Sequence, residues 1–250
     1  MKRLILLFTL LPILSIAQQT YVPNDNFETF LEANGMGNGI ANDDYVSTAN
    51  ISVVTQLWCN NQSIADLTGI EDFIELENLF CFDNNLTSLD VSNNTALEYL
   101  DCSHNELTSL DLSQNNLLKY LYCSSNELST LDLTLNPALE ILKCNSNAIT
   151  ALDLSQNSVL NQLMCYNNLL QCLNVNNGNN VNVLYFIADN NSFLNCIEVD
   201  NVAYSNSNWI GIDPLVSFST NCNYPFGCFS INPTLIKEKS NSVFLYPNPT

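Results

Sequence analysis

The feature that most constrains the fold is a cysteine that recurs every 21 residues through the middle of the chain. The series begins with one step of 22 residues and consists of Cys59, Cys81, Cys102, Cys123, Cys144 and Cys165. Around each cysteine lies the same frame, clearest over residues 97–113 as L-x-x-L-x-C-x-x-N-x-L-x-x-L-D-L-S. A fixed period of about 20 to 50 residues indicates coils stacked in a row, each contacting only its neighbours. We therefore expect a solenoid.

Each coil is expected to contain two short strands and no helix of normal length. In the first strand, Leu100 and Cys102 point inward, while Tyr99, Asp101 and Ser103 point outward. The second strand and its equivalents read L-D-L or L-D-V at residues 89–91, 110–112, 131–133 and 152–154. An asparagine follows the first strand of five successive coils, at Asn84, Asn105, Asn126, Asn147 and Asn168. Its amide can bond the backbone of its own turn and of the neighbouring coil.

The six periodic cysteines are predicted to be buried free thiols, with Phe186 filling the same position in the next coil. Neighbouring coils lie about 4.8 Å apart with parallel Cβ vectors, whereas a disulfide needs Cβ atoms about 3.8 Å apart. The other four cysteines are Cys172, Cys196, Cys222 and Cys228. Their three possible pairings stay open on sequence grounds. We favour Cys196 with Cys222, which would tie the last coil to the segment that covers it.

The two ends of the solenoid need caps. Lys2 and Arg3, the apolar residues 4–14 and the small residues 15–17 predict a secretory signal peptide at 1–17. Asn24 before an apolar pattern that Gly35 ends predicts a capping helix within residues 18–50.

The acids at 42–44 form a solvated turn or, less favoured because their spacing is poor, a calcium loop. No later stretch is long enough for a transmembrane helix.

Charge and motifs exclude several classes of function. The formal net charge is −19, so nucleic acid and anionic membranes would repel the chain. The single histidine, His104, lies in a turn beside a cysteine that the register buries, so a Cys–His pair is not expected. No phosphate-binding loop and no C-x-x-C pair occurs. We therefore predict no enzyme, no bound metal and no cofactor, with calcium as the one alternative.

An aspartate ladder runs along the second strands, at Asp90, Asp111, Asp132 and Asp153. Three readings compete for these carboxylates. They accept hydrogen bonds from turn amides and hydroxyls, they hold calcium between coils, or they supply the paired acids of a glycan-cleaving enzyme. We favour the first.

The outward positions of the first strands carry large side chains where other solvated strands carry Asp, Ser and Asn. The candidate ligand-binding face comprises Trp58, Phe80, Phe82, Tyr99, Asp101, Tyr120, Tyr122, Lys143, Tyr166 and Tyr185. Exposed aromatic patches usually mark binding surfaces. The alternative is that the rings only stabilise adjacent strands, by about 0.2–1 kcal/mol per pair. We favour binding, and the two readings are compatible.

The frame over residues 51–200 resembles the bacterial leucine-rich repeat in its 21-residue form. The opening Y-V-P-N-D-N-F-E at 21–28 and L-T-G-I-E-D-F at 67–73 look like the start of secreted leucine-rich repeat proteins of the Bacteroidota. So does C-I-E-V-D at 196–200. Residues 244–250, F-L-Y-P-N-P-T, resemble the first strand of a type IX secretion C-terminal sorting domain. Such a domain continues further, so we expect a fragment, with a linker and a truncated sorting domain at 231–250.

The expected architecture is a mainly β leucine-rich repeat solenoid of about seven coils, with a C-terminal cap at 201–230. The resemblance implies a secreted or outer-surface protein that recognises a protein partner without catalysis, as in adhesion. Carbohydrate binding is the alternative, because tyrosine and tryptophan stack on sugar rings. An enzyme acting on polysaccharide is less favoured, because Asp101 is the only evident acid on the aromatic face.

Overall fold

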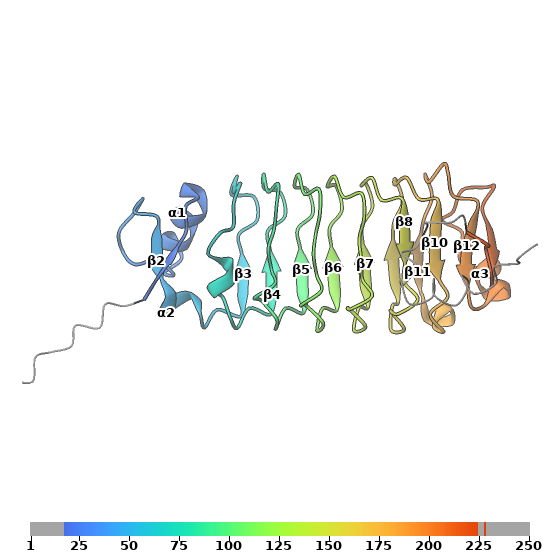
Figure 1. Ribbon diagram of the computed structural model, residues 1–250, viewed down its shortest axis with the longest axis horizontal. Helices are drawn as coiled ribbons and strands as arrows, with labels where there is room; N and C mark the ends of the chain where they lie inside the picture. The colour runs from blue at the N-terminus through green and yellow to red at the C-terminus, as the bar shows by residue number, and fades with distance from the viewer. Residues whose placement is uncertain (1–17, 225–227, 229–250) are drawn as a thin grey trace, which may run out of the picture.

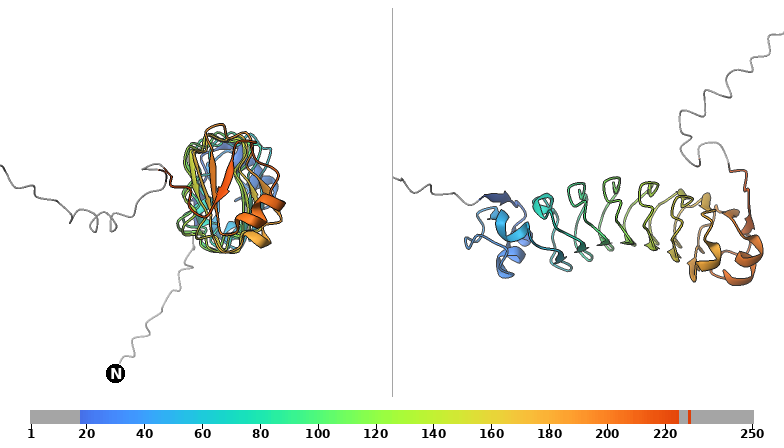
Figure 2. Two further views of the ribbon diagram at one scale, coloured as in Figure 1. Left: turned by 90° about the vertical axis from the view of Figure 1, so that its right-hand side faces the viewer. Right: turned by 90° about the horizontal axis from the view of Figure 1, so that it is seen from below.

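The molecule is a row of stacked coils, described here by a computed structural model for residues 18–224 and residue 228. Figure 1 shows the coils side by side along one axis, with α1 at one end and α3 at the other. Seen along this axis, the coils superpose in a flattened outline (Figure 2, left). The predicted solenoid is confirmed. The predicted signal peptide and the linker and sorting segment at 231–250 lie outside the described residues.

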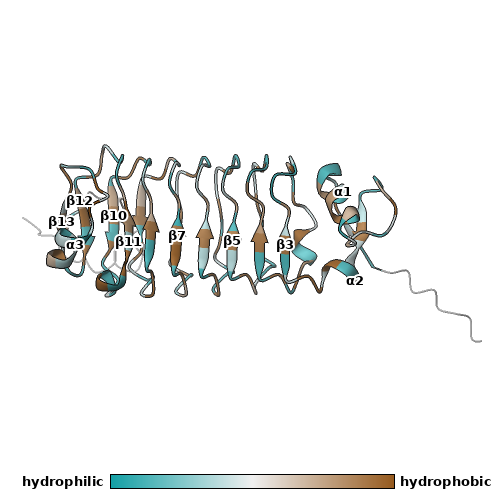
Figure 3. Cartoon of the chain, turned by 180° about the vertical axis from the view of Figure 1, so that it is seen from behind, coloured by the Kyte–Doolittle hydropathy of each residue, from teal (hydrophilic) through white to brown (hydrophobic). Residues whose placement is uncertain are grey.

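One side of the solenoid is a parallel sheet with one strand from each coil. Its seven strands, in spatial order, are β11 (Tyr185–Ile187), β9 (Gln162–Met164), β7 (Ile141–Lys143), β6 (Tyr120–Tyr122), β5 (Tyr99–Asp101), β4 (Asn78–Phe80) and β3 (Gln56–Trp58). Residues pair at equal repeat positions, for example Leu100 with Leu121. The middle residue of each strand is buried between two more exposed ones, and Figure 3 shows the matching alternation of apolar and polar residues. This sheet confirms the estimate of about seven coils.

The other side differs from the expectation of a second strand in every coil. Its parallel sheet has four strands, β8 (Ala151–Asp153), β10 (Cys172–Val175), β12 (Cys196–Val199) and β13 (Ser217–Ser219), all in the C-terminal part. In the earlier coils, residues 89–91, 110–112 and 131–133 form no strand within the described chain. The carbonyls that end these segments instead accept bonds from asparagine side chains of the next coil, as Val91 does from Asn115. Side-chain amides thus join the coils where strand pairing is missing.

The cysteine column lies in the core as predicted. All six periodic cysteines are free and fully buried. The prediction that Phe186 takes their position in the next coil is wrong, because Phe186 pairs in register with Leu163. The fully buried Ala188, two residues later, stands where the cysteine would be. Burial raises the pKa of the Cys59 and Cys144 thiols to about 12. The thiols therefore stay protonated at neutral pH and act as small apolar groups.

The predicted asparagine ladder is confirmed and extends to Asn191. In each step, the amide nitrogen donates to two backbone carbonyls of the core column, as Asn105 does to those of Cys81 (3.0 Å) and Cys102 (3.1 Å). Its Oδ1 accepts from the backbone N–H of Leu86 in the preceding coil at 2.9 Å. One side chain thereby satisfies backbone groups of two coils that are buried from water.

A second asparagine ladder was not anticipated. It consists of Asn94, Asn115, Asn136 and Asn157, all with no exposed surface. Asn115 Nδ2 donates to the carbonyls of Val91 and Asn94, both at 3.0 Å. The 21-residue spacing of these asparagines is itself visible in the sequence and could have revealed the ladder.

The N-terminal cap contains the predicted helix, α1 (Asp25–Ala33), which begins after Asn24. The Asn24 side chain accepts from the Phe27 N–H at 3.0 Å. Phe27 is fully buried and packs on Phe73 with ring centroids 6.4 Å apart, so the helix covers the open edge of the first coil. The antiparallel pair β1 (Gln19–Tyr21) and β2 (Tyr45–Ser47), the short helix α2 (Thr48–Ile51) and the 3-10 helix η1 (Ile70–Asp72) complete this end.

The acidic segment at 42–44 is a turn. The N–H groups of Asp43 and Asp44 donate to the buried carboxylate of Glu28. This is the favoured reading of the segment.

The C-terminal cap combines α3 (Val202–Asn208), the 3-10 helix η2 (Asn180–Asn182) and β13. Because β13 pairs in parallel with β12, the cap also adds one strand to the second sheet. Trp209 stacks on Phe186 with ring centroids 4.1 Å apart, which closes the last coil. Within the described chain, no helix is long and apolar enough to cross a membrane.

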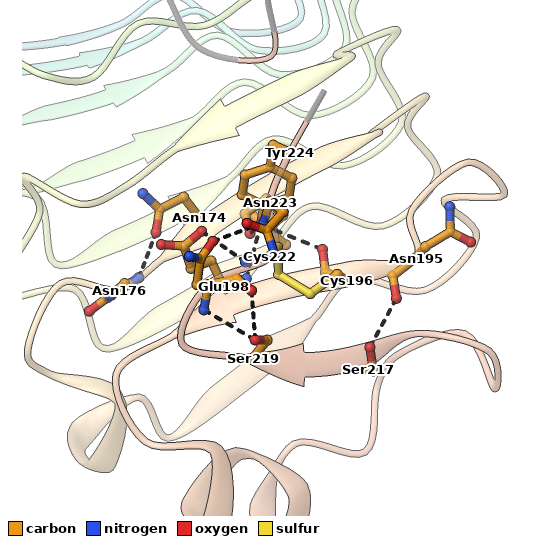
Figure 4. The surroundings of a disulfide bond; sticks show 12 residues. Asn174, Asn176, Asn195, Cys196, Glu198, Ser217, Ser219, Cys222, Asn223 and Tyr224 are labelled. Carbon is orange, nitrogen blue, oxygen red and sulfur yellow. Dashed lines mark hydrogen bonds between the residues drawn. A yellow bond between two sulfur atoms is a disulfide. The ribbon is translucent and has the colours of Figure 1, made fainter. Parts of the chain in front are cut away.

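Two disulfides fasten this cap. The favoured Cys196–Cys222 bond is confirmed, and the remaining pair is Cys172–Cys228. Figure 4 shows the Tyr224 side chain beside the first bond. Its hydroxyl donates to the carbonyl of Leu173 and accepts from the Glu198 N–H at 3.0 Å. The segment after β13 is thus held to two coils at once.

Thiol labelling under non-reducing conditions should test the buried column. We expect no reaction of the six free cysteines in the native protein and reaction of all six after unfolding, because folded thiols are covered and protonated. Mass spectrometry after alkylation counts the labels. Rapid labelling of the native protein would contradict the assignment.

The second asparagine ladder should contribute strongly to stability. Asn115→Ala removes two buried hydrogen bonds and leaves the carbonyls of Val91 and Asn94 with only their backbone donors, so we expect a loss of about 1–3 kcal/mol in the free energy of unfolding. Urea unfolding measures this loss. The adjacent exposed Asn116 gives the control, and Asn116→Ala should change stability by less than about 0.5 kcal/mol. Equal effects of the two changes would show that the ladder does not stabilise the stack.

Candidate binding face

The strands of the seven-stranded sheet hold the predicted aromatic side chains outward. Each strand buries its central residue, which is leucine in all strands but β11, where it is Phe186, so the residues before and after it face outward. Parallel register then places equivalent residues side by side, as Tyr99 beside Tyr120 and Trp58 beside Phe80. The backbone alone thus brings these side chains into two columns.

Five of the predicted rings form a continuous run across four coils, from β3 to β6. We call this run the aromatic face, with members Trp58, Phe80, Tyr99, Tyr120 and Tyr122. Trp58 stacks on Phe80 at 3.7 Å between ring centroids, and Phe80 lies 4.7 Å from Tyr99. Tyr99 contacts Tyr120 at 5.7 Å and Tyr122 at 5.2 Å. The separations fall in or near the range of favourable ring pairs.

The other three predicted aromatic residues stand apart from this run. Phe82, Tyr166 and Tyr185 are partly exposed, but none takes part in a ring pair of the described chain. Lys143, Met164 and Ile187 follow Tyr122 in its column. Tyr185 instead pairs with Gln162 in the other outward column, so its expected place in the column of Tyr122 is wrong. Not every outward position is open, since Ser103, expected to face solvent, is 9% exposed.

Asp101 lies within the aromatic face, paired in register between Phe80 and Tyr122. Its Oδ1 accepts from the Ser103 N–H at 3.1 Å. Burial raises the pKa of this carboxyl group, and the hydrogen bonds from Ser103 oppose the shift only in part. Its charge also contributes to the raised pKa of Tyr99, after burial and the neighbouring Tyr122.

Lys143 reaches back over the preceding coil. Its Nζ lies 4.1 Å from the centroid of the Tyr122 ring, within the range of a cation–π contact. The sequence placed Lys143 in the same column as Tyr122, but the contact depends on the direction in which the side chain folds.

A charged edge beside the aromatic face was not predicted from the sequence. The residues immediately before β4, β5, β6 and β7 are Glu77, Glu98, Lys119 and Glu140. Lys119 Nζ pairs with Glu98 at 2.8 Å, and Tyr120 Oη donates to Glu140 at 3.4 Å. The recurrence of charge at this one repeat position was the available signal.

The aspartate ladder is a set of turn acceptors, as favoured. The carboxylates of Asp90, Asp111, Asp132 and Asp153 each accept from the backbone N–H two residues later, at 2.9–3.0 Å. Hydrogen bonds from Ser92 and Ser113 lower the pKa of Asp90 and Asp111. His104 lies in a turn with left-handed backbone geometry (φ of 54°). The equivalent residue of the next coil, Ser125, has the same geometry (φ of 55°), so this turn does not depend on a histidine.

Comparisons with known proteins identify the fold. No model of a known protein family matches the chain. A segment of 75 residues is 40% identical to Internalin J of Listeria monocytogenes serotype 4b (strain F2365), which is 30% of this chain and 8% of that protein. The chain thus corresponds to only a small part of that relative.

Two crystal structures of internalins from Listeria monocytogenes strain 4b F2365 have the same architecture. InlF matches with a TM-score of 0.59 and 17% identity over 79% of this chain and 68% of its own. InlC2 matches with a TM-score of 0.53 and 19% identity over 82% of this chain and 99% of its own. The predicted leucine-rich repeat solenoid is therefore confirmed as the fold.

The burial of Asp101 should make the stability of the protein depend on pH. The pKa of Asp101 is higher in the folded than in the unfolded protein, so its ionisation lowers the stability of the fold at pH values above the folded-state pKa. At pH values below both pKa values the group is protonated in both states and has no such effect. We therefore expect Asp101→Asn to be more stable than the parent protein at pH 7, with the difference absent below about pH 3. Thermal unfolding across this range measures it.

Asp111→Asn is the matched comparison with opposite sign. Because hydrogen bonding lowers the pKa of Asp111, its ionised form stabilises the fold above the unfolded pKa and this contribution is lost in acid. The Asp111→Asn variant should therefore be less stable than the parent protein at pH 7. Shifts of the same sign in both variants would refute the electrostatic assignment of Asp101.

Proposed function

We propose that this chain, a leucine-rich repeat solenoid related to Listeria internalins, is a non-catalytic recognition module that binds a protein partner through its aromatic face. The observation that carries the proposal is the uninterrupted run of rings on the outward side of β3 to β6. Tyrosine and tryptophan are the side chains that most often anchor protein interfaces.

The scaffold favours binding because it holds the rings in place before a partner arrives. Each ring stands next to a buried leucine of the same strand, and parallel pairing fixes its position relative to the next coil. Contacts between rings restrict their rotamers further. Less conformational entropy is then lost on association than with flexible loops.

The exposure of the rings also supports this role. Trp58 is 55% exposed although it stacks on Phe80. A ring pair that served only to stabilise adjacent strands would gain by covering more of its apolar surface. The aromatic face therefore retains surface that a partner can bury.

An extracellular location is part of the proposal. The apolar sequence at 4–14 after Lys2 and Arg3 supports export by a signal peptide. Two disulfides fit an oxidising compartment. The sequence similarities at 21–28 and 244–250 support a Bacteroidota origin and type IX sorting to the cell surface, where the module would act in adhesion.

Carbohydrate binding is the second candidate. Trp58 and the neighbouring rings offer flat surfaces that can stack on sugars. An enzyme acting on polysaccharide is less supported, since paired carboxyl groups are needed and Asp101 is the only acid among the outward strand residues of the aromatic face.

Replacement of two central tyrosines tests the proposal. Tyr120→Ser with Tyr122→Ser should reduce binding to partners found on an array of extracellular proteins by at least about tenfold, because two interface anchors are lost. Leu135→Ser with Val159→Ser removes comparable exposed apolar surface outside the aromatic face and should leave binding unchanged. Thermal unfolding verifies that both variants fold.

Two outcomes would contradict the proposal. Undiminished binding by the tyrosine variant would show that another surface recognises the partner. Binding by the parent protein to a glycan array but to none of the arrayed proteins would favour the carbohydrate candidate.

A further inference from the structure

We propose that the aromatic face recognises lysine or arginine side chains of its protein partner. This inference rests on the proposed function and adds the chemistry of the partner's contact residues. The inference rests on two observations. Acidic side chains surround the rings, and one ring, that of Tyr122, already contacts the ammonium group of Lys143.

The chain has very few cations of its own with which to balance its acids. It contains 25 acidic residues and six lysines and arginines together. In the part that the structure describes, the lysines are Lys119 and Lys143, and there is no arginine. Both lysines lie on the aromatic face or at its charged edge.

Both lysines show how the face binds a cation. Lys143 places its ammonium group over the Tyr122 ring, and Lys119 pairs with Glu98 beside the same strand. The C-terminal half of the aromatic face therefore already holds ammonium groups by a ring and by a carboxylate. These are the two interactions that a partner's lysine or arginine would use.

The N-terminal half of the face offers the same groups without an internal cation. Trp58 and Phe80 contact neither lysine in a cation–π pair of the described chain, and tryptophan is the ring that binds cations best. Glu77 is exposed immediately before the strand of Phe80, and Asp101 follows in the next coil. Rings and carboxylates thus coincide on β3 to β5, where the described strands carry no lysine or arginine.

Charge separates this partner from the other candidates. A neutral sugar would gain no charge attraction from the acidic edge, and an acidic ligand would be repelled by it. A guanidinium group can stack on a ring while donating two hydrogen bonds to a carboxylate, so arginine fits both features. The four coils span about 14 Å at about 4.8 Å per step, which an extended peptide of about five residues covers.

Short synthetic peptides provide the probe. We would measure, at physiological ionic strength, the affinity of a labelled peptide in which arginine alternates with serine. The comparison peptide replaces each arginine by citrulline, which keeps the shape and most hydrogen-bond donors but removes the charge. We expect the arginine peptide to bind at least about tenfold more tightly. Equal affinity for both peptides would overturn the inference.

Two triple variants with the same change in net charge separate a local site from general attraction. Glu77→Gln, Asp101→Asn and Glu140→Gln remove carboxylates at the aromatic face, and should weaken peptide binding by at least about fivefold. Asp90→Asn, Asp111→Asn and Asp132→Asn remove three exposed carboxylates elsewhere, and should leave it within about twofold. Asparagine can serve at these turn positions, since Asn174 accepts from the Asn176 N–H at 2.9 Å. Equal weakening in both variants would overturn the inference.

This inference and the proposed function fail in different ways. If the tyrosine variant loses its arrayed protein partners while arginine and citrulline peptides bind alike, the recognition module stands and the cationic contact is wrong. If the tyrosine variant keeps its protein partners, the proposed function fails whatever the peptides do.

Discussion

The stack depends on side-chain amides that satisfy the backbone of a neighbouring coil. A solenoid turns its chain several times per coil, and each turn leaves carbonyl and N–H groups that face the interior. Asn105 serves the cysteine carbonyls of two coils, and Asn115 serves the carbonyls of Val91 and Asn94. An unsatisfied buried polar group costs about 1–3 kcal/mol, so repetition of these bonds at every step keeps all coils at one spacing.

Fixed spacing has a direct consequence for the surface. Once coils repeat at the distance of paired strands, residues at equal repeat positions form columns, and aromatic residues of neighbouring coils come within reach of one another. The chain uses this geometry to present Trp58, Phe80 and Tyr99 as one run, while the cysteines and leucines behind them remain covered. The buried column and the aromatic face are therefore two sides of the same strand pattern.

The ends of the stack are closed by different means. At the N-terminus, α1 places Phe27 on Phe73, and hydrogen bonds from Thr20 to Asp72 and from Asn26 to Ser63 join the cap to the first coils. At the C-terminus, Trp209 covers Phe186, and the disulfides Cys196–Cys222 and Cys172–Cys228 attach the following segment. Both caps protect edges at which strands and apolar side chains would otherwise be open to another chain.

The amino-acid sequence by itself determined the repeat, the inward position of the cysteines, the first asparagine ladder and the outward position of the rings. These properties follow from period and alternation, which are local. The favoured Cys196–Cys222 pair was also correct, although spacing alone left three pairings open. Only the tertiary structure decided that the second sheet is confined to the C-terminal coils, and that asparagine amides replace strand pairing before it. It likewise decided that five rings touch while Tyr166 and Tyr185 stand apart, and that Lys143 covers Tyr122. Such contacts depend on side-chain rotamers and on the separation of coils at each point, and a repeat pattern specifies neither.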